Sequence, residues 1–193
     1  MKKIILTLFV ALSLLLYSIP SFAFSLSVGI PMSQTITGKQ AGKSYGNAPD
    51  KTSGNFLGVS FLSIGLGMDS YTTKFKTGNC NGCWGVGADA VLKTDMTNIF
   101  YQLPVPVVNL IIGTGKGTTE YDCKYSFGDC SKFYEKGSAT QWYTSIGMPI
   151  IPFFDIHLSY RAITAKNIES KYEEGKKDDN SGSVTGVGIA FNF

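Results

Sequence analysis

Large apolar residues alternate with small or polar residues in several short segments of the chain. In residues 183–193, one face of an extended strand would carry Thr185, Val187, Ile189, Phe191 and Phe193. The other face would carry Val184, Gly186, Gly188, Ala190 and Asn192. A period of two predicts a β-strand with one apolar face. Residues 24–33 repeat the pattern, with Phe24, Leu26, Val28, Ile30 and Met32 opposite Ser25, Ser27, Gly29, Pro31 and Ser33.

A third segment adds charge to the alternation. In residues 154–162 the apolar face holds Phe154, Ile156, Leu158, Tyr160 and Ala162, and the opposite face holds Asp155, His157, Ser159 and Arg161. A single strand of this kind would also suit a soluble sheet with its charged face in water. When the sheet closes into a narrow barrel, however, small and polar side chains facing inward and bulky apolar ones facing outward give the polarity that a bilayer requires.

Weaker alternation marks five further strands, which include Leu57–Phe61, Leu66–Phe75, Thr97–Leu103, Val108–Thr114 and Trp142–Met148. Short apolar or proline-bearing connections (62–65, 103–107 and 148–153) alternate with long polar ones (35–54, 77–85, 122–137 and 167–182). Three short turns and four long loops predict eight antiparallel strands with both ends of the mature chain on one side. Lys116 interrupts the outward series after Thr114, which predicts either the end of the lipid-facing part or a β-bulge.

The first residues resemble a secretory signal peptide. Two lysines precede an apolar run from Ile4 to Leu16, and Ser21-Phe22-Ala23 fits a signal-peptidase site. We therefore expect cleavage after Ala23 and a mature domain of residues 24–193, with an uncleaved N-terminal anchor as the alternative. No later apolar run is long enough for a transmembrane helix. If the mature chain crosses a membrane, it must do so with strands.

Charge and composition narrow the function classes. The formal net charge is +3, and the two lysines of the signal peptide account for two of these charges, so the mature domain is nearly neutral. A nearly neutral chain gives no electrostatic reason to expect a nucleic-acid partner. With 22 glycines, 13% aromatic residues and only 16% charged residues, the composition is typical of a β protein and not of a disordered chain.

In pattern, residues 24–193 resemble the small eight-stranded outer-membrane proteins typified by the OmpA transmembrane domain and the opacity and Ail-type adhesion proteins. In the last strand, Gly188, Phe191 and the terminal Phe193 match the signal that the barrel-assembly machinery reads, although Gly186 stands where that signal usually has a polar residue. The resemblance implies an all-β, eight-stranded antiparallel up-and-down transmembrane β-barrel in a bacterial outer membrane. It also implies contact with outer-membrane lipid. We expect a monomer without a cofactor or a metal site.

Four cysteines lie in predicted loops. Cys80 and Cys83 belong to the second long loop, and Cys123 and Cys130 to the third. The second pair is too widely spaced for a usual zinc site, and no helix N-terminus is predicted that could activate a thiol. In an exported chain we therefore expect structural disulfides, either within each loop or between the two loops.

His157 is the only histidine. His157-Leu158-Ser159 resembles the His-x-Ser arrangement of outer-membrane lipid A deacylases, in which a histidine activates a serine. Tyr160 stands where an asparagine usually follows, and the nearest downstream acid, Glu169, falls at an unexpected spacing. The short turn at Pro152 would also place the histidine near the periplasmic end, far from lipid A.

The interpretation that we favour for this face is a luminal polar network. Asp155, His157 and Arg161 would pair with Asp69, and Asp95 is a further candidate. Buried ion pairs and hydrogen bonds of this kind satisfy polar groups in a narrow interior. Such a network would close the lumen and make the protein a poor channel.

A closed lumen leaves function to the exposed loops. One loop is highly charged (169–180), and aromatic residues cluster in and around another: Tyr121, Tyr125, Phe127, Phe133, Tyr134 and Trp142. Some of these rings would form the aromatic girdle, and the others could contact a host or cell-surface ligand. We expect a structural or adhesive role without catalysis. The alternatives are an outer-leaflet lipid-modifying enzyme, a narrow pore and a soluble exported barrel that binds a small ligand.

Overall fold

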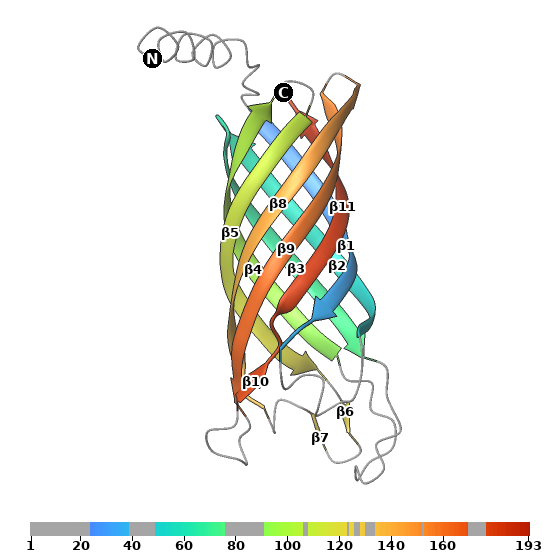
Figure 1. The fold of residues 1–193 in the computed structure, drawn as a ribbon, viewed down its shortest axis with the longest axis vertical. Helices are drawn as coiled ribbons and strands as arrows, with labels where there is room; N and C mark the ends of the chain where they lie inside the picture. The colour runs from blue at the N-terminus through green and yellow to red at the C-terminus, as the bar shows by residue number, and fades with distance from the viewer. Residues whose placement is uncertain are drawn as a thin grey trace, which may run out of the picture.

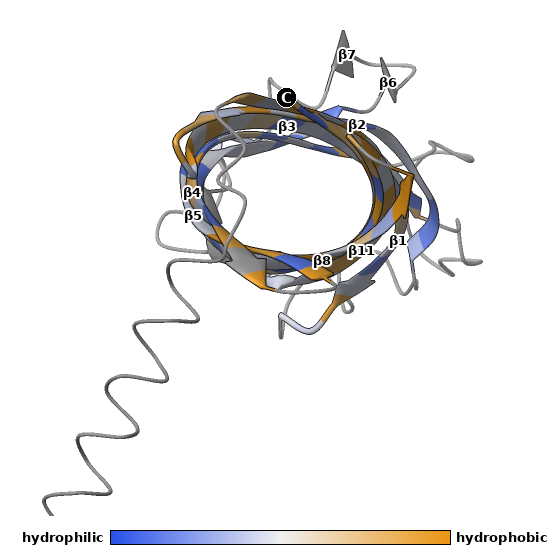
Figure 2. Cartoon of the chain, turned by 90° about the horizontal axis from the view of Figure 1, so that it is seen from above, coloured by the Kyte–Doolittle hydropathy of each residue, from blue (hydrophilic) through white to orange (hydrophobic). Residues whose placement is uncertain are grey.

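Eight long strands form one closed antiparallel barrel in the computed structural model, which describes residues 24–38, 49–75, 91–105, 108–122, 124–125, 128–129, 134–151, 153–169 and 177–193 (Figure 1). The long strands are β1 (Phe24–Ile36), β2 (Pro49–Phe61), β3 (Ile64–Phe75), β4 (Val91–Val105), β5 (Val108–Asp122), β8 (Gly137–Ile151), β9 (Phe154–Glu169) and β11 (Gly182–Asn192). Hydrogen-bonded neighbours follow the order β9-β11-β1-β2-β3-β4-β5-β8, and the pairing of β8 with β9 closes the ring seen along its axis in Figure 2. The predicted eight-stranded antiparallel barrel is confirmed.

The short connections and the two ends of the described chain, Phe24 and Phe193, lie together at one end of the barrel. Phe24 and Phe193 exchange two backbone hydrogen bonds, of 3.2 and 2.8 Å. Three short strands lie at the opposite end, as Figure 1 shows: β6 (Lys124–Tyr125), β7 (Gly128–Asp129) and β10 (Lys177–Asp179). The predicted signal peptide, residues 1–23, and all four cysteines lie outside the described residues.

Compared with a soluble protein, the barrel has reversed polarity, with apolar side chains on its outer face and polar ones on its inner face. Leu158 is 63% exposed, whereas its neighbour along β9, His157, is 5% exposed. Exposed apolar side chains from every long strand form a belt next to the short turns, here called the apolar belt: Phe24, Leu26, Val28, Ile30, Leu57, Val59, Ile64, Leu66, Met68, Ile99, Tyr101, Ile112, Ile146, Met148, Ile156, Leu158, Tyr160, Ile189 and Phe191. A closed barrel with a continuous apolar exterior and polar interior is a transmembrane β-barrel. Among the described residues, no helix is long and apolar enough to cross a membrane.

Three luminal rings lie against glycines of a neighbouring strand. The lumen of an eight-stranded barrel is only wide enough for side chains, so a ring fits where the facing residue has no Cβ. A Cβ on any of these glycines would come within 3.0 Å of the facing ring, closer than real Cβ atoms approach. The register pairs are Gly65 with Phe100, Gly113 with Tyr143, and Gly147 with His157.

The outer ends of β1 and β2 differ from the sequence prediction. The predicted loop 35–54 is too long, because β1 continues to Ile36 and β2 begins at Pro49. A bulge after Pro31 turns Ser33 to the outer face, where its hydroxyl lies 2.8 Å from that of Thr185. The prediction that Ser33 faces inward is therefore wrong, because the bulge shifts the alternation by one residue.

The β1–β2 ladder is also shorter than either strand. Its register runs from Phe24 opposite Phe61 to Gly29 opposite Phe56 and stops there. Pro31 has no backbone N–H to donate beyond that point. Gly54 has a φ of +148°, a conformation that L-residues rarely adopt.

Lys116 does not lie at a bulge. The register of β4 and β5 is continuous from Val91 opposite Asp122 to Val105 opposite Val108. The lysine therefore continues the outward face of β5, and of the two predicted explanations only the end of the lipid-facing part remains.

Candidate functional site

The middle of the lumen is crossed by an ion pair. Arg161 on β9 and Asp69 on β3 belong to strands on opposite sides of the ring, four places apart in the strand order. The Arg161 Nε donates to Asp69 Oδ2 at 2.9 Å, and Nη2 donates to Oδ1 at 3.3 Å. Both side chains are at least 94% buried, at 6% and 2% exposed. Two N–H···O bonds to one carboxylate fix the guanidinium across the full width of the barrel.

Amide side chains complete this level of the lumen. Gln141 on β8 donates from Nε2 to Asp69 Oδ2 and to Asn98 Oδ1, both at 2.6 Å. The guanidinium carbon of Arg161 lies 3.4 Å from the centre of the Phe56 ring and 5.0 Å from that of Tyr143. The arginine is therefore held by charge at its edge and by aromatic rings on its faces.

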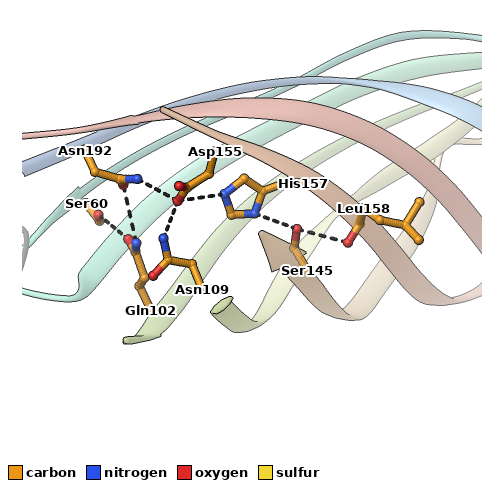
Figure 3. A network of polar contacts seen from close by, with 8 residues as sticks. All are labelled: Ser60, Gln102, Asn109, Ser145, Asp155, His157, Leu158 and Asn192. Atoms are coloured by element: carbon orange, nitrogen blue, oxygen red, sulfur yellow. Dashed lines mark hydrogen bonds and ion pairs between the residues drawn. The ribbon is translucent and has the colours of Figure 1, made fainter. Parts of the chain in front are cut away.

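A second polar level lies nearer the short turns (Figure 3). Asp155 Oδ2 accepts hydrogen bonds from Asn192 Nδ2, at 2.7 Å, and from Asn109 Nδ2. Gln102 on β4 reaches Asn192 Oδ1 on the opposite strand β11 at 3.5 Å. The hydroxyl of Ser60 donates to Gln102 Oε1 at 3.2 Å. This level therefore also joins opposite walls.

His157 lies between Asp155 and Ser145 in Figure 3. Its Nδ1 is 3.2 Å from the Ser145 hydroxyl, and its Nε2 is 3.8 Å from Asp155 Oδ2, beyond hydrogen-bond length. The hydroxyl of Ser159 donates instead to the carbonyl of Gly186 at 3.2 Å and accepts a bond from Arg161 at 2.6 Å. The histidine and Ser159 of the His-x-Ser segment are thus bonded to different groups.

A small cavity separates the two polar levels. Its volume is about 50 Å³, and its lining includes Phe100, Tyr143, Ser145, His157 and Arg161. Pockets that bind organic ligands usually measure hundreds of cubic ångströms. This space fits a few water molecules and excludes a lipid acyl chain.

Charged groups on the outer face gather beyond the apolar belt. Lys93 lies 3.3 Å from Asp95 and 3.7 Å from Glu120, and Lys136 lies 3.1 Å from Glu120. The prediction that Asp95 joins the luminal network is wrong, because Asp95 lies on the outward face of β4 and accepts a bond from the Ser70 hydroxyl at 2.6 Å.

These outer groups perturb one another. The hydrogen bond to Asp95 raises the pKa of the Lys93 ammonium. Partial burial raises the pKa of the Asp95 carboxyl, but the bonds from Ser70 and Lys93 outweigh that effect and hold the pKa below its usual value. Both groups therefore remain charged near neutral pH and neutralise each other.

The structure brings Asp69 to Arg161 and places Asp155 next to His157. The amides that complete both levels were not predicted from the sequence; they belong to Asn98, Gln102, Asn109 and Gln141. A signal for them exists, because Asn98 and Gln102 alternate with the outward residues Ile99 and Tyr101 along β4. They could have been found by extending the alternation of each strand to its inner face.

The predicted assembly signal lies in β11 and directly after it, and its last residue, Phe193, is at the end of the barrel that carries the short turns. Phe191 and Phe193 point outward, at 37% and 64% exposed, and Gly188 pairs with Gly29 of β1. The Phe191 ring lies 5.3 Å from that of Phe154, and the Phe193 ring lies 6.3 Å from that of Phe24. These rings form part of the lipid-facing surface next to the short turns.

Comparisons with known proteins agree with this architecture. No protein-family model and no curated protein sequence matches the chain. Among solved structures, Neisserial surface protein A matches with a TM-score of 0.58 and 12% sequence identity, covering 89% of this chain and 97% of that one. The outer membrane protein W of E. coli matches with a TM-score of 0.54 and 13% identity, covering 90% and 98%. At these identities the likeness concerns the fold. Together with the apolar belt and the closed polar lumen, it confirms the predicted resemblance and location: the chain is a small eight-stranded β-barrel of the bacterial outer membrane.

Proposed function

We propose that this protein is a closed barrel whose function lies in its extracellular loops, which bind a host or cell-surface ligand. The observation that carries the proposal is the pair of links across the lumen. Arg161 joins Asp69 in the middle, and Gln102 joins Asn192 near the short turns. With opposite walls joined at two levels, the interior offers no passage, so the narrow-pore alternative is disfavoured.

The lumen also gives little support to the lipid-modifying alternative. Ser145, His157 and Asp155 stand in an order that suits a catalytic triad, but all three side chains are buried in the lumen, where Ser145 and His157 line a cavity of about 50 Å³. The outward neighbours of this cavity on β9 are the apolar-belt residues Ile156 and Leu158. A lipid ester in the outer leaflet would face those side chains and not the histidine.

The wall of the barrel is well suited to present loops. β4, β5, β8 and β9 contain 15, 15, 15 and 16 residues, against 13, 13, 12 and 11 in β1, β2, β3 and β11. The longer strands extend beyond the apolar belt on one side and carry the connections 123–136 and 170–176. One protein of similar fold is named as a surface protein, Neisserial surface protein A, which is consistent with a role at the cell surface.

Assembly and partners follow from the same proposal. The barrel acts as a monomer in outer-membrane lipid, after removal of residues 1–23 and insertion by the barrel-assembly machinery through the signal at Gly188, Phe191 and Phe193. Disulfides among Cys80, Cys83, Cys123 and Cys130 hold the loops in the oxidising compartment outside the inner membrane. No cofactor takes part.

The experiment is deletion of residues 123–136 with a short glycine linker in their place. Cells that display the variant are compared with wild-type cells for binding to host cells and extracellular matrix, and the heat-dependent gel shift checks that the barrel is folded. A matched control deletes residues 170–176. Loss of binding in the first variant with an unchanged gel shift supports the proposal. Unchanged binding in both variants, or a steady conductance of the wild-type barrel in planar bilayers, contradicts it.

A further inference from the structure

Lys116 is the charged residue of the described outer face that lies nearest the short turns. It stands eight residues along β5 from Val108. At about 3.3 Å per residue and a strand tilt of about 40°, its Cα lies roughly 20 Å above that end of the barrel. The apolar band of outer-membrane barrels is about 25 Å tall. The lysine therefore emerges close to the outer edge of the hydrocarbon, where its long side chain can reach the headgroups.

The surroundings of Lys116 form a regular polar row. In the register of four adjacent strands, Thr97 of β4 stands beside Lys116, Lys116 beside Thr140 of β8, and Thr140 beside Thr164 of β9. All four side chains are exposed on the outer face. Within the described part of the chain, none of the three threonine hydroxyls has a hydrogen-bond partner. The row thus presents one ammonium and three free hydroxyl donors side by side.

The row below marks the boundary with the hydrocarbon. Its members in the register are Ile99, Thr114, Trp142 and Ala162. The Thr114 hydroxyl is already bonded to the Gln141 carbonyl at 3.0 Å. Trp142 is 69% exposed, and tryptophan is enriched at the interface between lipid chains and headgroups. The polar row is therefore the first one that a lipid headgroup would meet.

Charge balance separates Lys116 from Lys93 and Lys136. Lys93 and Lys136 are neutralised by Asp95 and Glu120, at 3.1 to 3.7 Å. Lys116 has no ion pair among the described residues. A lone ammonium at the edge of a low-dielectric layer needs an anion, and no carboxylate of the described wall supplies one.

We propose that Lys116, with the hydroxyls of Thr97 and Thr140, binds a phosphate group of an outer-leaflet lipid headgroup. Phosphate oxygens accept hydrogen bonds from an ammonium and from hydroxyls at once, and they are the anions that the leaflet itself presents at this depth. Trp142 rests beneath the bound headgroup against the upper part of the acyl chains. The site faces the membrane and is separate from the loops.

The test uses the full mature chain refolded in phosphatidylcholine vesicles, with Trp84→Phe so that Trp142 is the only tryptophan. Bisphosphorylated lipid A is titrated into the vesicles, and Trp142 emission reports binding. Lys116→Gln is expected to weaken binding about fivefold, the effect of one basic residue at an anionic surface. Adding Thr140→Val to Lys116→Gln should weaken lipid binding further. Lys51→Gln, an exposed lysine on β2 that lies outside the row, is the matched control and should leave binding unchanged.

Two further arms identify the anion and its source. Lipid A without phosphate should bind equally to wild type and Lys116→Gln, and millimolar inorganic phosphate should not displace the bisphosphorylated lipid. Equal losses in Lys116→Gln and Lys51→Gln, or equal binding of phosphorylated and dephosphorylated lipid by the wild type, overturn the proposal. Displacement by inorganic phosphate at these concentrations overturns the lipid as the ligand. The gel shift checks that each variant is folded. The proposal that the loops bind a cell-surface ligand does not depend on the outcome of these titrations.

Discussion

Breaking the ion pair across the lumen should destabilise the barrel strongly. Asp69→Asn keeps the shape of the side chain but leaves the buried Arg161 without its counter-charge. Removal of one partner of a buried pair costs about 3–5 kcal/mol. Arg161→Met should cost a similar amount, because it strands the Asp69 carboxylate and removes the contact with Phe56 at 3.4 Å. The double variant leaves no charge unpaired, so its loss should be at least about 2 kcal/mol smaller than the sum of the single losses.

The assay is equilibrium unfolding in lipid vesicles by guanidinium chloride, followed by tryptophan emission and checked by the heat-dependent gel shift. The matched control is the exposed pair Lys93–Asp95, whose side chains are 40% and 42% exposed at a similar separation. Lys93→Gln and Asp95→Asn should each change the free energy of unfolding by less than about 1 kcal/mol. Single luminal losses that are equally small, or losses that simply add in the double variant, would refute the reasoning.

Two other features of the wall lead to measurable expectations. Gly65→Ala should lower the free energy of unfolding by about 1–3 kcal/mol, since its Cβ would collide with the Phe100 ring. Phe100→Leu in the Gly65→Ala background should recover part of that loss. If nothing is recovered, the ring is not the cause. Because the β1–β2 ladder stops early, backbone amides that face the gap between these strands should exchange with deuterium faster than amides of the continuous β4–β5 ladder. They are the amides of residues 30–36 that face β2 and those of residues 49–55 that face β1. Uniform protection by mass spectrometry would contradict this.

The alternation of side chains determines most of what could be predicted. Because successive residues of a strand point to opposite faces, the outward series of Phe154 to Ala162 and the inward series of Asp155 to Arg161 follow from the sequence alone. The prediction failed for Ser33, where one extra residue in the bulge exchanges the faces. It also failed for Asp95, which lies two residues from the outward Thr97 and four from the outward Ile99 on β4 and therefore points outward with them. The bulge before Ser33 depends on the neighbouring strand, whereas the outward direction of Asp95 follows from the unbroken alternation of β4.

The partner of each luminal group could not be predicted, since it depends on register and closure. His157 and Ser159 are two residues apart on one strand, so their side chains point the same way and stand nearly 7 Å apart. The imidazole Nδ1 of His157 instead lies 3.2 Å from the hydroxyl of Ser145 on the adjacent strand β8. Asp69 and Arg161 are 92 residues apart in sequence and meet only because the ring of strands closes. A single sequence shows which residues share a face of a strand, but it does not show which strands bring two luminal side chains within hydrogen-bond distance.

The reversed polarity of the barrel separates the residues that hold it together from those that can act. In lipid, burial of the outer apolar side chains cannot by itself fix one barrel shape, because hydrocarbon chains are as apolar as the belt. The polar links inside the lumen join specific strands, Arg161 to Asp69 and Gln102 to Asn192, and therefore select the arrangement of the wall. Groups committed to that task are not available to a substrate. Substitutions inside the lumen should therefore change stability first, and substitutions beyond the apolar belt should change binding while the barrel remains folded.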